Sequence, residues 1–410
     1  MSALGDRIRG IVKPVPVPEM ASLPPPADLS VLGGEHRDGC FVVERRWTAE
    51  SRHGREAIGT FAECLDDGGS AAPLFAADAR APFVFFDLET TGLSGGAGTL
   101  AFLVGCGSFA ADGGFAARQY LLSAQGEERA LLERVHAELA GAGAIVSFNG
   151  KSFDAPLLES RFAFHRLART LAGRPHVDAL HPARQFWACA DCSLGALERR
   201  LLGVRRAGDI DGFDVPARYF QFVRSGNARP LEQVLEHNRS DLLTLAALTA
   251  RLFFLARAGA GAARDAREAI ALGRVYGRSD DLRRSRDAFS RAVELAGGVD
   301  DLSASVDALR GLAITLRRMR EYHDAAACWS RLMEMDDCPH AVAREAAEAL
   351  AIHHEHRVRD LDAARSFALK GLIPGEGAPG LGNAQRTPRW AENVRYRVAR
   401  IERKLSGRLL

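Results

Sequence analysis

Long hydrophobic runs are scarce in this 410-residue sequence, and their scarcity excludes a class of proteins. No run reaches the roughly 18 apolar residues that a membrane-spanning helix needs. The longest candidate, 242–256, is interrupted by Arg251. The first twenty residues contain no apolar segment of the kind that a secretory signal carries. We therefore expect a cytoplasmic protein.

Cysteine is sparse, and the number of cysteines is odd. The seven cysteines are scattered along the chain, which argues against a disulfide framework. Cys189 and Cys192 form a CxxC pair, but a zinc site would need further ligands from elsewhere, such as His176 or His181. We expect two reduced thiols, with metal or redox use as the alternative.

Lysine is the rarest charged residue. Only four of the 54 basic residues are lysine, and the formal net charge is +2. A compositional bias explains much of this excess of arginine. Arginine also forms bidentate contacts with phosphate, so a nucleic-acid partner stays possible. With 47% hydrophobic and 26% charged residues, the composition excludes wholesale disorder.

The order of sequence patterns predicts four regions. Residues 1–35 are a proline-rich tail, and 36–80 combine a short β region with a linker. In that β region we expect strands at 40–45 and 57–61 around a turn at 53–54. Residues 81–258 form the third region and 264–410 the fourth.

The third region predicts an α/β domain with a mixed sheet flanked by helices. Apolar runs predict strands, and an apolar stripe predicts the first helix. The expected strands are 82–89, 99–109, 115–122 and 144–148, and the expected helices are 127–139, 155–167 and most of 193–257.

The fourth region contains a repeated helical pattern. A small residue is followed twelve positions later by another small residue, and four positions later by an aromatic one. The three sets are Gly273, Ser285 and Phe289; Ala313, Ala325 and Trp329; Ala351, Ala363 and Phe367. This order predicts tetratricopeptide-like helix pairs with a capping helix from Pro388, and an irregular helical bundle is the alternative.

Acidic residues stand at the end of the strand expected at 82–89. Strand alternation places Asp87 and Glu89 on the same face. Two carboxylates on one face of a buried strand require a cation that neutralises them. The alternative is that the strand end is solvated, in which case no cation is needed. Thr90, Thr91, Gly92 and Leu93 follow as a turn whose backbone N–H groups could meet an anionic ligand.

Polar residues also follow the strand expected at 144–148. Asn149 ends the strand, Lys151 is placed to hold a phosphate, and Asp154 begins a helix. Asp154 alone is equally typical of a helix N-cap.

His237 and Asp241 lie four residues apart and therefore on one helical face. The carboxylate suits a metal ion, and the imidazole suits a base in the same pocket. A surface ion pair between the two is the alternative. Together with the earlier acids, the set suits two Mg²⁺ or Mn²⁺ ions that hydrolyse a phosphodiester.

Three motifs in this order resemble the DEDD exonuclease superfamily of the RNase H-like fold. They are D-x-E-T-T-G at Asp87, N-x-x-x-F-D ending at Asp154, and H-x-x-x-D at Asp241. The resemblance covers about residues 82–257 and implies two-metal 3′→5′ hydrolysis of nucleic acid. It makes Asp87, Glu89, Asp154 and Asp241 the metal ligands and catalytic residues, with His237 as the base. This chain departs from the superfamily pattern in one respect. His237 stands four residues before Asp241, which is the spacing of the tyrosine class, whereas the histidine class has a spacing of five.

The whole layout is similar to the YprB-like family, also called MrfB-like, of bacterial exonucleases. The phrases that carry this resemblance are 95–99, 147–154, 181–184, 192–198, 219–220 and 236–238. It implies DNA repair beside a helicase, which would dock on the repeat tail. DNA is then the expected substrate. An exoribonuclease and a non-catalytic scaffold are the alternatives.

Several further residues are candidates for nucleic-acid contacts. Thr91, Leu93 and Asn149 match superfamily positions that lie near the substrate, although turn and strand-end roles explain them as well. Arg184, Arg205 and Arg206 could line a nucleic-acid path or remain solvated, and Tyr219 and Phe220 could stack on a base or pack in the core.

Overall fold

The computed structural model divides the chain into two compact units. The sheet unit comprises Met1–Ala62, Pro82–Asp178 and Leu197–Ala247, and the helical unit comprises Glu63–Ala81, Ala179–Ala196 and Leu248–Leu410. The structure describes residues 28–66, 75, 79–92, 98–187, 191–297, 301–372 and 389–407. Most of the proline-rich tail, Leu93, Cys189 and Pro388 lie outside the described residues. No helix in the described ranges is long and apolar enough to cross a membrane.

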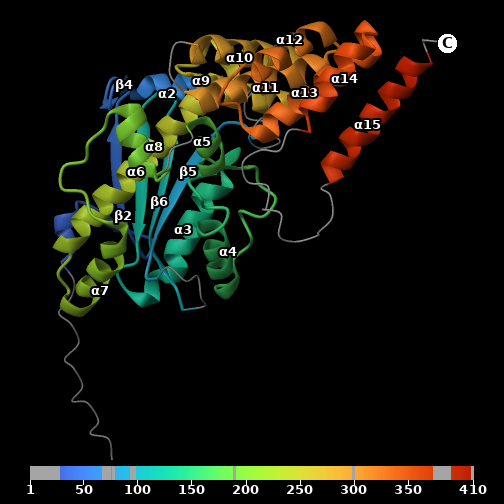
Figure 1. The fold of residues 1–410 in the computed structure, drawn as a ribbon. Coiled ribbons are helices and arrows are strands. Elements are labelled where there is room, and N and C mark those ends of the chain that lie inside the picture. Colours follow the sequence, from blue (N-terminus) through green and yellow to red (C-terminus); the bar gives the residue numbers. More distant parts are fainter. Residues whose placement is uncertain are drawn as a thin grey trace, which may run out of the picture. The chain divides into compact units, whose positions relative to one another are not determined.

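A seven-stranded mixed sheet forms the centre of the sheet unit, in the order β1-β2-β7-β6-β5-β8-β9. The last three strands of this order run parallel, and the other pairs are antiparallel. Figure 1 shows these strands with helices packed beside them. The strand bounds are β1 Glu35–Arg37, β2 Cys40–Trp47, β5 Phe83–Thr90, β6 Ala101–Phe109, β7 Phe115–Leu121, β8 Ala144–Ser147 and β9 His176–Asp178. The predicted mixed sheet flanked by helices is confirmed.

The central strand β5 has a neighbouring strand on each edge and is covered on both faces. Its first four residues, Phe83 to Phe86, are almost completely buried, and the run is apolar for that reason. β5 pairs antiparallel with β6, with Asp87 opposite Gly105, and parallel with β8, with Phe85 opposite Val146. Because β5 and β8 run parallel, the residues that follow them emerge at the same edge of the sheet.

The helices of the sheet unit are α2 Ile58–Asp66, which continues past the unit's boundary, α3 Glu128–Ala140, α4 Asp154–Phe164, α7 Val215–Ser225 and the first part of α8 Arg229–Ala258. Apolar side chains of α3, α4, α7 and α8 join the strands in one core. A buried ion pair from Arg161 to Glu128 connects α4 with α3. The predicted helices at 127–139 and 155–167 correspond to α3 and α4.

The strand predicted at 57–61 is wrong. β3 Arg52–His53 and β4 Glu56–Ala57 form a two-stranded hairpin, and α2 begins at Ile58. Ile58, Phe61 and Leu65 are buried, with three- and four-residue spacings that place them on one helical face. The helical period therefore prevails over the β-branched and aromatic residues in this segment. β2, by contrast, pairs with β7 along its whole length and belongs to the main sheet.

The helical unit is built mostly from helices that each pack against the next along the chain. Its helix at 180–187 packs instead against the helix at 266–278. The helices of this unit include α5 Leu180–Trp187, α9 Ala266–Arg278, α10 Leu282–Ala296, α11 Leu302–Arg318, α12 Tyr322–Met333, α13 His340–His353, α14 Leu361–Lys370 and α15 Arg389–Ser406. An all-helical region after the sheet domain is confirmed.

Small residues of the predicted repeat lie where helices approach one another. A Cβ atom at Gly273 would lie 2.7 Å from the ring of Phe289. One at Gly311, which is not a position of the predicted repeat, would lie 2.2 Å from the same ring. The aromatic ring of α10 therefore fits against α9 and α11 only because both positions lack a side chain. At the C-terminal end, buried Glu355 accepts hydrogen bonds from Arg400 and Lys404 of α15.

Candidate functional site

The acids at the end of β5 have two other acids as electrostatic neighbours. Burial raises the pKa of Asp87 well above its ordinary value, and the charges of Asp241, Glu89 and Asp154 raise it further. These four residues come from β5, the start of α4 and the middle of α8. The structure therefore brings together the four carboxylates that the motifs singled out.

Two more of these carboxyl groups have strongly raised pKa values. Burial and then nearby acids raise the pKa of Glu89 to about 8, although His237 acts in the opposite direction. Burial and the charge of Asp178 raise the pKa of Asp154 to about 7. Buried carboxylates that repel one another need a cation to stay ionised at neutral pH.

Asp154 does not act as a helix N-cap. It is the first residue of α4, and the preceding Phe153 stands at the cap position without a side-chain cap hydrogen bond. The N-cap interpretation of Asp154 is therefore wrong. Its side chain instead lines a cavity together with Glu89.

Asn238 holds the carboxylate of Asp87 in place. Its side-chain Nδ2 donates to Asp87 Oδ2 at 2.8 Å, and its Oδ1 accepts from Gln119 at 2.9 Å. Asn238 fits because Gly105 faces it, where a Cβ atom would lie 2.3 Å from Asn238 Oδ1. The phrase 236–238 contained this residue, but nothing in its spacing indicated the contact.

Asp178 fixes the loop that leads into α4. Its carboxylate accepts from the backbone N–H groups of Asn149 at 2.8 Å and Lys151 at 3.1 Å. Asn149 has a φ of 67°, a left-handed conformation that asparagine tolerates. The side chain of Lys151 is exposed. Asp178 lies 24 residues beyond the motif and was not predicted.

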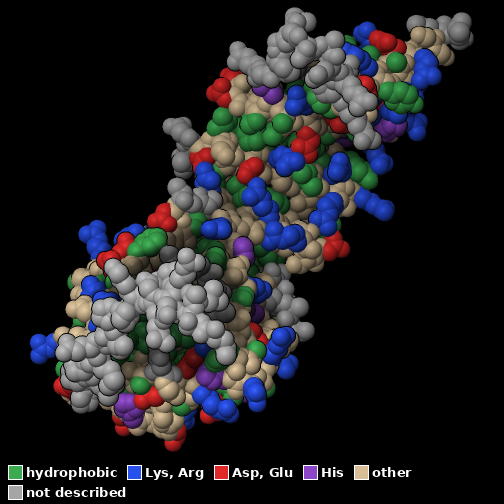
Figure 2. All heavy atoms as spheres, turned by 90° about the horizontal axis from the view of Figure 1, so that it is seen from below, with side chains coloured by type: hydrophobic (Ala, Val, Ile, Leu, Met, Phe, Trp, Pro, Cys, Tyr) green, Lys and Arg blue, Asp and Glu red, His purple; other side chains and the backbone are tan. Residues whose placement is uncertain are grey.

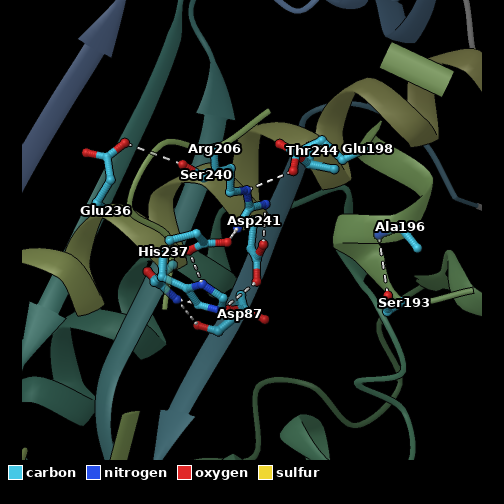
Figure 3. Close-up of polar contacts among 12 residues, drawn as sticks. Asp87, Ser193, Ala196, Glu198, Arg206, Glu236, His237, Ser240, Asp241 and Thr244 are labelled. Atoms are coloured by element: carbon cyan, nitrogen blue, oxygen red, sulfur yellow. Dashed lines mark hydrogen bonds and ion pairs between the residues drawn. The ribbon is translucent and has the colours of Figure 1, made fainter. Parts of the chain in front are cut away.

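His237 lies between two acids. Its Nδ1 is 2.8 Å from Asp209 Oδ1, and its Nε2 is 3.5 Å from Asp241 Oδ2. Burial lowers the pKa of His237, but Asp241, Asp209 and Glu89 outweigh this effect and raise it. The neighbouring acids therefore favour the protonated form of His237. Figure 3 shows it close to Asp241 and Asp87.

Arg206 is the second positive charge in the cluster. Its guanidinium contacts Asp241 Oδ1 at 2.6 Å and Glu198 Oε2 at 2.8 Å (Figure 3). Only 12% of its side chain is exposed. Its charge therefore pairs with these carboxylates, and the alternative that Arg206 remains solvated is wrong.

The donor set fits a hard divalent cation. Among the described residues, no group of three or more His, Cys, Asp or Glu side chains stands as a ready metal site. Asp241 is instead neutralised by Arg206 and His237. Carboxylate oxygens are the ligands that Mg²⁺ and Mn²⁺ prefer, and the raised pKa values of Asp87, Glu89 and Asp154 indicate a deficit of positive charge.

An open cavity of about 410 Å³ adjoins these acids. Thr90, the last residue of β5, and Gly92 line it. Thr91 instead stabilises that turn, since its N–H donates to Leu100 O and its Oγ1 accepts from Leu100 N, both at 3.0 Å. Leu93 lies outside the described residues, and neither Asn149 nor Lys151 lines the cavity.

Two exposed phenylalanines form part of the cavity wall. The exposed fraction is 61% for Phe153 and 78% for Phe213, which lies in the 3₁₀ turn Gly212–Asp214. Large apolar side chains that are exposed together at one cavity are typical of a ligand-binding surface. Phe213 lies within 193–257, most of which was expected to be helical, and no sequence signal distinguished it.

The two aromatic residues proposed for stacking have different environments. Tyr219 is buried and stacks on Phe102 with ring centroids 4.1 Å apart, and its hydroxyl donates to Leu122 O. Packing in the core, rather than base stacking, is therefore the role of Tyr219. Phe220 is 43% exposed but does not line the cavity.

The mixed sheet and the acids at the ends of β5 and β8 define an RNase H-like domain. In agreement, residues 84–253 match the sequence model of the RNase_H superfamily. The chain is also 28% identical over 380 residues to a Bacillus subtilis (strain 168) protein named "Uncharacterized protein YprB". That match covers 90% of this chain and 87% of the relative. The fold is RNase H-like, and the domain is nuclease-like.

Proposed function

We propose that this protein is a metal-dependent 3′→5′ exonuclease that hydrolyses DNA. The observation that carries the proposal is the group of four acids beside an open cavity with two exposed aromatic rings. The match to the RNase_H superfamily supports a nucleic acid as the substrate. The polarity of cleavage and the preference for DNA rest on the resemblance of the motifs.

Asp87, Glu89, Asp154 and Asp241 would hold two divalent ions. When bound, such ions supply a water of lowered pKa and stabilise the leaving oxygen of a phosphodiester. The protein contributes the positions of the carboxylates. Asn238 orients Asp87, and Asp178 holds the loop before Asp154 through two backbone N–H groups.

His237 is positioned to accept a proton. Because its Nδ1–H is directed to Asp209, the other ring nitrogen, Nε2, faces the acids. A histidine with its Nδ1 held in this way presents Nε2 to a water in the site. Asp209 therefore acts as a positioning residue that selects the tautomer of His237.

Phe153 and Phe213 would cover the end of the substrate. Stacking of a base on an aromatic ring contributes about 1–3 kcal/mol and tolerates any base. Such a surface holds a terminal nucleotide without reading its sequence, as a degradative exonuclease requires.

Phe213→Ala is expected to raise KM for a DNA oligonucleotide about tenfold while leaving kcat within about twofold. The ring contacts the base and not the scissile phosphate, so binding is lost and the chemical step is not. Steady-state kinetics of the purified variant test this, with Phe220→Ala as the matched control outside the cavity. Equal loss of kcat and kcat/KM would place Phe213 in the chemical step instead.

Cleavage polarity and substrate class are tested with matched oligonucleotides. A 5′-labelled DNA strand should give a ladder that shortens stepwise, and a 3′-labelled strand should release labelled mononucleotide at once. The corresponding RNA should be cut more slowly. Release of mononucleotide from the 5′ end, or faster cleavage of RNA, would overturn the polarity or the substrate of this proposal.

The helical unit is proposed to dock a partner protein, in keeping with tetratricopeptide-like repeats. The consecutive helix packing and the small residues against Phe289 support this proposal. A repair helicase is the partner that the family resemblance favours.

A further inference from the structure

A second cavity, of about 240 Å³, lies within the helical unit between α12 and α13. Trp329 and Tyr322 form aromatic walls, and the alanines at 325, 326 and 349 leave the space open. Ile352, which is 37% exposed, lies at its rim. The volume is below that of most small-molecule sites and matches a single large apolar side chain.

The rim of this cavity is positively charged. Arg317 and Arg357 supply this charge. His353 and His356 also line the cavity, and no acidic residue does. Arg357 lies over the ring of Tyr322, 3.9 Å from its centroid. Within the described residues, neither Arg317 nor Arg357 is ion-paired with a carboxylate, whereas Arg310 and Arg318 of the same helix α11 pair with Glu345 and Asp280.

The pairing of an apolar cavity with unpaired cations restricts the ligand. A nucleic-acid backbone would use the arginines but leave the apolar space unfilled. A neutral apolar segment would fill the space but leave the cations without counter-charges. Figure 2 shows that basic side chains with hydrophobic ones between them are common on the face it draws, so charge alone does not select this site. The cavity distinguishes this site, because only a ligand with a protruding apolar side chain can fill it.

We propose that the cavity between α12 and α13 binds an acidic peptide segment of a partner protein, with one large apolar residue inserted beside Trp329. Acidic residues on either side of that anchor would contact Arg317 and Arg357. Peptides commonly bind helical surfaces through one buried anchor and complementary charge. This inference deepens the proposed docking role of the helical unit and does not depend on nuclease activity.

The test uses the full-length protein and a short fluorescein-labelled peptide with a central tryptophan flanked by Asp and Glu. Fluorescence anisotropy should show saturable binding that weakens as salt rises, because the exposed charges are screened. The double variant Arg317→Glu/Arg357→Glu should weaken binding at least about tenfold. Arg331→Glu, on α12 but outside the cavity, is the matched control and should bind like the parent.

Ile352→Ser provides a second variant with little risk to the fold, since the side chain is part-exposed, and it should also weaken binding. A peptide with serine in place of tryptophan, and one with lysines in place of the acids, should bind at least about tenfold more weakly. Equal binding of either control peptide, or no effect of the double variant, would overturn the proposal. So would a short DNA strand that competes for the site through the same two arginines.

The nuclease assay separates this inference from the proposed function. The double variant should degrade an oligonucleotide at the parent rate, because both arginines lie in the helical unit. An inactive parent that still binds the acidic peptide would overturn the exonuclease and leave the docking site intact. An active parent that does not bind the peptide would overturn the docking site alone.

Discussion

Asp154→Asn is expected to abolish DNA cleavage and, in EDTA, to make the protein more stable than its parent. The carboxylate is buried close to other acids, and its pKa is raised to about 7. Ionisation therefore costs folding free energy, and a neutral amide of the same shape removes that cost. The gain is on the order of 1–3 kcal/mol, while activity falls on the order of a thousandfold.

Urea denaturation in EDTA and in Mg²⁺ measures the free energy of unfolding of the parent and the variant without and with the metal. The parent should gain stability on adding Mg²⁺, since an ion that binds only the folded state stabilises it. The variant should gain much less. A matched control is Asp112→Asn in the exposed turn after β6, which should change neither stability nor activity. A variant less stable than the parent in EDTA would contradict the account of repelling carboxylates.

Glu128→Ala is expected to destabilise the sheet unit by about 3–5 kcal/mol, because it removes the carboxylate that pairs with a buried arginine. Arg161 Nε and Nη2 each contact a Glu128 oxygen at 2.6 Å, and His165 Nε2 lies 2.8 Å from the same carboxylate. Only 9% of each of the two paired side chains is exposed. Loss of the acid therefore removes the charged connection between α3 and α4.

The same carboxylate makes stability depend on pH. Burial alone would raise the pKa of Glu128, but hydrogen bonds from Arg161 and His165 outweigh it and lower the pKa. A lowered pKa in the folded state means that the stabilisation is present above the ordinary glutamate pKa of about 4.5 and is lost as pH falls below it. Denaturation curves between pH 7 and pH 3 should converge for parent and variant. Glu133→Ala, an exposed pair with Arg129, should stay within about 0.5 kcal/mol of the parent, and an equal loss there would refute the argument.

Most strands of the main sheet and the four acids were predictable because each depends on local pattern, whereas the short strands β1 and β9 were not predicted. β5 is a continuous apolar run ended by Asp87 and Glu89, and alternation alone places the two acids on one face. Asp154 and Asp241 follow a strand end and a helical spacing. The strand and the helix form as these patterns predict because β5 and α8 are long and well packed.

The residues that support the acids were not predictable, because their partners are distant in the chain. Asn238 reaches Asp87 across 151 positions, and only the absence of a side chain at Gly105 makes the contact possible. Arg206 and Asp209 lie 35 and 28 positions before their partners Asp241 and His237, which direct their charges inward. α2 was mistaken for a strand because Ile58 and Phe61 favour both structures, and burial of one helical face decides between them.

The most direct test of the central claim is cleavage of a 5′-labelled DNA strand by the full-length protein, with Mg²⁺, Mn²⁺ or EDTA, beside Asp154→Asn. The account predicts a ladder that shortens from the 3′ end with either metal, no product in EDTA, and no product from the variant under any condition. Cleavage in EDTA, or full activity in Asp154→Asn, would contradict the assignment of these four acids as the metal-binding site.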